Sequence, residues 1–148
     1  MDIVHLIQSA VAPVFLLSGV GVTLGVLTNR LARIVDRARL LEEQLEATDA
    51  ATSTDQATSR RKSLETSLQM LARRAHYINV AITLCTLSAL LVAMVVMLLF
   101  AGAFLSIRLE VAIAIMFIAS MVLLTGSFFA FLIEVRLATA SLRIGLPP

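Results

Sequence analysis

The sequence predicts an all-α membrane protein with three transmembrane helices, the first two extended into a cytoplasmic antiparallel coiled-coil hairpin. Three apolar runs, at residues 6–28, 77–101 and 111–133, contain no Lys, Arg, Asp or Glu. Each exceeds the roughly 20 residues that a helix needs to cross about 30 Å of hydrocarbon. The runs also lack the alternation of polar and apolar faces that a water-soluble helical bundle shows.

Positive charges lie almost entirely on one side of these runs. Nine Lys and Arg residues fall between the first and second runs and two follow the third, whereas the connection at residues 102–110 holds only Arg108. Positive residues beside short loops stay in the cytoplasm. The sequence therefore predicts a multi-pass protein of the bacterial cytoplasmic (inner) membrane, with the N-terminus outside and the C-terminus in the cytoplasm.

The composition leaves no room for a separate globular domain. The 148 residues are 59% hydrophobic, so we expect residues 1–148 to form a single membrane domain. The first run is expected to be a retained span, because the positive charges follow it instead of preceding it. Basic residues close to the membrane are mixed with acidic ones, which favours anionic lipid headgroups over nucleic acid as their partner.

Apolar residues continue beyond the membrane at alternating spacings of three and four. The first series is Leu27, Leu31, Ile34, Ala38, Leu41 and Leu45, and the second is Leu64, Leu68, Leu71, Ala75, Ile78 and Ile82. Two such seams predict a helical hairpin at about residues 30–76, with Ala38 opposite Leu71 and Leu41 opposite Leu68. Its polar tip is expected at residues 48–58. The alternative is an amphipathic pair lying on the headgroups.

Small and polar residues share one face at the inner half of the first run. They are Ser18, Gly21, Gly25, Thr28 and Asn29. Such a face allows close approach of helix backbones, within the chain or between protomers. The alternative is a pore wall, where small and hydroxylated side chains leave space and offer oxygen ligands.

A second group of polar residues is predicted at the cytoplasmic ends of the three spans. Its members are Arg30, Arg73, Arg74, Asn79, Glu134 and Arg136. For Glu134 we expect an interfacial ion pair with hydrogen bonds, and the alternative is an ion or proton site. The hydroxyl groups within the second and third spans are mostly expected to bond their own preceding carbonyls.

The sequence gives no support for an enzyme. It has no His-Glu-x-x-His metal motif, no glycine-rich phosphate loop and no paired carboxylates inside a span. The single cysteine, Cys85, lies within the second run and cannot form an intrachain disulfide. We therefore expect no catalytic residues, no bound metal and no cofactor.

Three sequence blocks resemble the bacterial membrane proteins of domain of unknown function family 2721. They are Ala12-Pro13 with the first span up to Thr28-Asn29-Arg30, the basic and aromatic lead-in at residues 73–77, and residues 131–136 around Glu134. The family more often has a basic residue directly before the glutamate, where this chain has Ile133. The resemblance implies a topology and no activity.

Two functions are compatible with these patterns. One is a self-associating, non-enzymatic scaffold or accessory subunit, whose cytoplasmic hairpin binds a protein partner. The other is a homo-oligomeric passive ion channel, with the first transmembrane helix lining the pore. A lone three-helix protein buries little surface, so both readings expect a homo-oligomer.

Overall fold

Three long helices make up the computed structural model, which describes residues 3–50, 55–105 and 109–142. α1 spans Ile3–Ala50, α2 spans Asp55–Leu105 and α3 spans Glu110–Leu142. Within these described ranges no residue belongs to a strand. Each helix contains a stretch that is long and apolar enough to cross a membrane. The described part of the chain is therefore all-helical with three candidate membrane spans, as its apolar runs predict.

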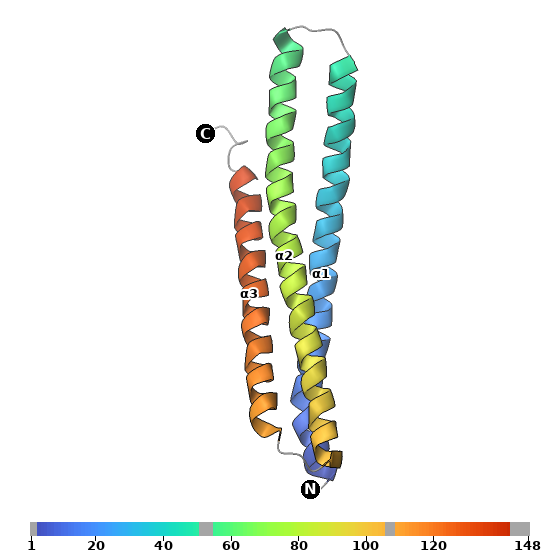
Figure 1. Cartoon of the computed structure of the whole chain (residues 1–148). Coiled ribbons are helices and arrows are strands. Elements are labelled where there is room, and N and C mark those ends of the chain that lie inside the picture. The colour runs from blue at the N-terminus through green and yellow to red at the C-terminus, as the bar shows by residue number, and fades with distance from the viewer. Residues whose placement is uncertain (1–2, 51–54, 106–108, 143–148) are drawn as a thin grey trace.

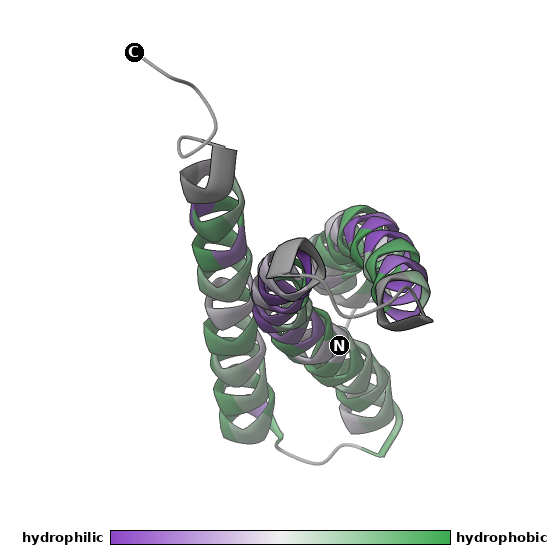
Figure 2. Cartoon of the chain, turned by 90° about the horizontal axis from the view of Figure 1, so that it is seen from above, coloured by the Kyte–Doolittle hydropathy of each residue, from purple (hydrophilic) through white to green (hydrophobic). Residues whose placement is uncertain are grey.

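α2 is the central helix, with α1 on one side of it and α3 on the other in both views (Figure 1, Figure 2). At 1.5 Å per residue, the 48 residues of α1 and the 51 of α2 extend over about 70–75 Å, more than twice the thickness of the hydrocarbon. The α1–α2 pair consequently continues past the described end of α3 (Figure 1). In Figure 2 the hydrophilic residues gather at this projecting end.

The helix ends differ from the predicted ones mainly at the tip of the pair. α1 continues three residues beyond Ala47, and α2 begins at Asp55, so much of the predicted tip at 48–58 is helical. That segment contains three Ala residues, which favour helix, and no Pro or Gly to interrupt one. Residues 51–54 lie outside the described ranges. α2 also extends to Leu105, into the predicted connection at 102–110.

Two apolar clusters hold the helices together. The first joins all three helices through Val20 and Leu27 of α1, Ala81 and Cys85 of α2, and Leu124 and Ala130 of α3. The small side chains of Ala81 and Cys85 allow both outer helices to approach α2 closely. The second cluster, Ile34, Leu71 and Ile78, joins only α1 and α2. The core of the protein is therefore a thin line of contacts along α2.

Buried serines add hydrogen bonds between α2 and α3. Ser88 donates to the carbonyl of Ser120 at 2.8 Å, and Ser127 donates to the carbonyl of Ala81 at 2.7 Å. Both serines are fully buried. The expectation that hydroxyls bond carbonyls of their own helix is correct for Thr83, Thr86 and Thr125. It is wrong for these two serines, because the neighbouring helix is close enough to supply the acceptor.

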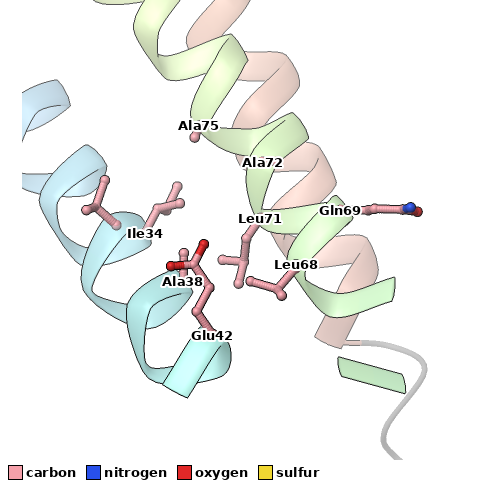
Figure 3. A pocket seen from close by; sticks show the side chains of 9 residues that line it. Ile34, Ala38, Glu42, Leu68, Gln69, Leu71, Ala72 and Ala75 are labelled. Carbon is pink, nitrogen blue, oxygen red and sulfur yellow. The ribbon is translucent and has the colours of Figure 1, made fainter. Parts of the chain in front are cut away.

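The α1–α2 pair bears an open surface groove. It has a volume of about 310 Å³, and its lining residues are drawn in Figure 3. Leu71 and Leu68 of α2 point toward the part of α1 that carries Ala38, and Ala75 lies further along α2. Leu71 is buried against α1 in the second cluster, and the short side chain of Ala38 leaves room for a larger residue in this layer.

The pairing of α1 with α2 predicts a specific crosslink. In a Cys85→Ser background, cysteines replacing Leu41 and Leu68 should form a disulfide within one chain under mild oxidant, because both positions lie at the α1–α2 interface. The control pair, at Leu41 and Arg61, should stay reduced, since Arg61 lies about two helical turns further along α2 and is exposed. Equal crosslinking of both pairs, measured by gel mobility after proteolysis, would contradict this pairing.

Candidate functional site

The most distinctive site is a buried carboxylate at the end of the apolar part of the bundle. Glu134 of α3 is 0% exposed, although it follows directly on the third apolar run. Its Oε1 accepts two hydrogen bonds from Arg74 of α2, from Nε at 3.2 Å and from Nη2 at 2.9 Å. Arg30 of α1 approaches the other oxygen, with Nη2 at 3.1 Å from Oε2. We call these three residues the Glu134 cluster.

Each helix contributes one member of the Glu134 cluster. A buried carboxylate without a counter-charge is strongly unfavourable, so two guanidinium groups at this position balance its desolvation. The side chains of Arg74 and Arg30 are 22% and 35% exposed, so both cations reach the surface while the carboxylate does not. The cluster thus ties the ends of three apolar segments to one another.

Arg30 makes fewer polar contacts with Glu134 than Arg74 does. Within the described chain Oε2 of Glu134 accepts no well-directed hydrogen bond, so Arg30 meets it as an ion pair only. The guanidinium carbon of Arg30 also lies over the ring of Phe131, 5.2 Å from its centroid, which is a favourable cation–π distance. Glu134 and Phe131 are three residues apart on α3 and therefore share one helix face.

The other predicted members of the polar group do not join this cluster. Arg73, Asn79 and Arg136 are exposed, and none of them contacts Glu134 in the described structure. Arg73 directly precedes Arg74 in the sequence, and this neighbour turns about 100° around the helix, away from α3. The structure thus brings together three of the six predicted residues, Arg30, Arg74 and Glu134.

Ser18, Gly21, Gly25, Thr28 and Asn29 form an exposed surface, the small-residue face of α1. At about 100° per residue they occupy an arc of roughly 100°, nearly opposite Val20 and Leu27, which pack against α2. A Cβ atom placed on Gly21 or Gly25 would meet nothing within 4 Å. The face therefore has no packing partner within the described chain.

The hydroxyl of Thr28 is already satisfied within α1. It donates to the carbonyls of Leu24 at 2.9 Å and Gly25 at 3.1 Å. Ser18 and Asn29 make no side-chain hydrogen bond in the part of the chain that the structure describes. Polar groups without partners are unfavourable in hydrocarbon, so this face is suited to contact with another polar or small-residue surface, or with water.

The sequence did not predict the contact of Phe131 with Arg30 or the interhelical hydrogen bonds of Ser88 and Ser127. Phe131 looks like an ordinary apolar residue of the third span, and only its spacing of three from Glu134 signals that an arginine paired with the carboxylate would also meet its ring. The interhelical role of Ser88 and Ser127 has no sequence signal apart from the small size of serine. Among the described residues no group of three His, Cys, Asp or Glu side chains could hold a metal ion.

Comparison with known proteins gives one finding. No curated protein and no solved structure matches the chain. A family model described as "Protein of unknown function (DUF2721)" matches residues 10–144, which include all three members of the Glu134 cluster and the whole small-residue face. Since this match covers far more than half of the sequence, the chain belongs to the family DUF2721.

Proposed function

We propose that this protein is a self-associating, non-enzymatic membrane scaffold or accessory subunit. The observation that carries the proposal is the small-residue face of α1, which is exposed and unpartnered in the single chain. Helices associate in lipid through such faces, because small side chains allow backbones to approach and to gain van der Waals contact. A second copy of the chain offers the same face, and a symmetric contact would cover both.

The projecting α1–α2 pair supplies the surface for a protein partner. It extends beyond α3 (Figure 1), and its outer positions are charged and exposed, as at Arg37, Glu43 and Glu65. The heptad spacing of its apolar residues supports an antiparallel coiled-coil hairpin. The excess of positive charge at this end supports a cytoplasmic location in a bacterial inner membrane, with the N-terminus outside.

Enlarging the glycines tests the association directly. Gly21→Leu and Gly25→Leu should leave the single chain folded, because the new side chains meet no atom of the chain itself and leucine favours helix more than glycine. Both variants should shift the purified protein in mild detergent from an oligomer towards the 16.0 kDa monomer. The measurement is light scattering coupled to size-exclusion chromatography.

The matched control is Ala114→Leu, which enlarges a small, exposed residue on α3 and should leave the oligomer unchanged. Wild-type oligomer size in both glycine variants would show that the small-residue face packs against nothing. A monomeric wild-type protein would remove the proposal of self-association altogether.

The alternative function is a homo-oligomeric passive ion channel with α1 lining the pore. The observation that favours it is the exposure of Ser18 and Asn29 on the same open face as the glycines, since polar groups around a central axis would stabilise a water-filled path.

Water access distinguishes the two functions. In a Cys85→Ser background, single cysteines at positions 18, 21, 25 and 28 should be shielded from small polar thiol reagents if protomers pack through this face. Vesicles containing assembled protein should then conduct ions no faster than empty vesicles. Rapid reaction at all four positions, together with ion flux that modification alters, would favour the channel and contradict the scaffold.

A further inference from the structure

We propose that Arg30 binds the phosphate group of an anionic phospholipid at the basic end of the bundle. Glu134 and Phe131 position the Arg30 guanidinium for this contact. This inference concerns a site within one chain and does not depend on self-association. It rests on the orientation of the Arg30 guanidinium, the unequal charges of the Glu134 cluster, and the apolar surface directly below Arg30.

Glu134 and Phe131 orient the guanidinium of Arg30, but most of its N–H donors have no acceptor among the described residues. One nitrogen, Nη2, lies 3.1 Å from Glu134 Oε2, and the plane rests over Phe131 at 5.2 Å. A guanidinium group has five N–H donors in a fixed fork, and Arg30 makes no hydrogen bond to a described side chain or carbonyl. With 35% of its side chain exposed, it can offer the remaining donors to an outside acceptor without moving.

Charge at the cluster favours an anion. The guanidinium groups of Arg30 and Arg74 contribute +2 and the Glu134 carboxylate −1, so the cluster carries a net +1. Arg33 and Arg37 follow Arg30 at spacings of three and seven, which places them on the same side of α1, and both are exposed. Phosphate oxygens, like carboxylate oxygens, match the planar fork of arginine, because they accept two parallel N–H bonds.

The depth of the site favours a lipid as the source of that phosphate. Arg30 follows the first apolar run by two residues and Glu134 follows the third by one, which is where headgroups lie. Val26, one helical turn below Arg30, is 49% exposed, and Ile133 beside Glu134 is 44% exposed. A phospholipid could therefore place its phosphate on Arg30 and its acyl chains along these residues, whereas free phosphate would gain only the polar contact.

The site is separate from the small-residue face. Arg30 lies about 150° around α1 from the centre of that face. A variant at Arg30 can therefore change lipid binding while the oligomer remains intact, and the two proposals can fail independently.

The test is thermal unfolding of the purified full-length protein in mild detergent at constant ionic strength, with three added probes. They are short-chain phosphatidylglycerol, short-chain phosphatidylcholine and inorganic phosphate. A ligand that binds only the folded protein stabilises it by RT ln(1 + L/Kd), where L is the free ligand concentration, so Tm rises with the logarithm of that concentration once it exceeds Kd. We expect phosphatidylglycerol to raise Tm in this way, and the other two probes to have little effect at the same concentration.

Arg30→Lys keeps the charge beside Glu134 but loses the planar fork, and should weaken the apparent affinity for phosphatidylglycerol about tenfold or more. Phe131→Leu keeps the arginine and removes its aromatic support, and should also weaken binding. If Arg30→Lys does not fold, the binding measured for Phe131→Leu tests the proposal in its place. The control is Arg39→Lys, at an exposed position on the other side of α1, which should bind like the wild type.

Three results would overturn the proposal. Equal Tm shifts with phosphatidylglycerol and phosphatidylcholine would show that net anionic charge is not recognised. Equal shifts with inorganic phosphate would identify a free anion as the ligand. Unchanged binding in both Arg30→Lys and Phe131→Leu, or equal loss in Arg39→Lys, would show that diffuse positive charge attracts the lipid.

Discussion

The arrangement of the three helices depends on one buried carboxylate and its two arginines. α1 and α3 pack mainly against α2, and the Glu134 cluster is the place where side chains of all three helices meet through charge. Removing one partner from a buried ion pair typically destabilises a protein by about 3–5 kcal/mol, because the remaining charge stays desolvated. Apolar packing along α2 is thin, so a directional interaction of this size can set the relative depth of the helices.

The same constraint explains how the two proposed surfaces can coexist on α1. Arg30 reaches Glu134 of α3, while Val20 and Leu27 pack against α2. With α1 in this rotation, Gly21 and Gly25 point outward. The ion pair and the apolar contacts are thus compatible with the same rotation of α1, and the glycines are exposed in it.

Much of the fold follows from the sequence, because the constraints on a membrane span are severe. A chain that must satisfy its backbone hydrogen bonds in hydrocarbon can form either helices or a closed barrel. The apolar runs at 6–28, 77–101 and 111–133 have the length of a spanning helix, about twice that of a spanning strand. The seam spacing also predicted that α1 and α2 lie side by side beyond the membrane. Helix ends were less predictable, since the sequence at residues 48–50 and 55–58 contains no Pro or Gly to break a helix and no large apolar residue to mark its boundary.

The candidate site was predictable in depth but not in detail. Sequence position shows that Arg30, Arg74 and Glu134 lie at one level, yet whether Arg73 or Arg74 turns towards α3 depends on the rotation of α2. That rotation is set by tertiary contacts, among them the bonds of Ser88 and Ser127 to backbone carbonyls, which leave no periodic pattern in the sequence. The exposure of Gly21 and Gly25 could not be predicted for a related reason, because it too depends on how α1 packs against α2.

The central claim, that Glu134 couples the helices through its arginines, is tested most directly by a double-mutant cycle. The variants are Arg74→Gln, Glu134→Gln and the pair together, compared by reversible unfolding in mixed micelles. Each single change should destabilise the protein, and the double variant should lose at least about 1 kcal/mol less than the sum, as expected for residues in direct contact. Losses that add to within about 0.5 kcal/mol would contradict the claim, because they would show that the two residues act independently.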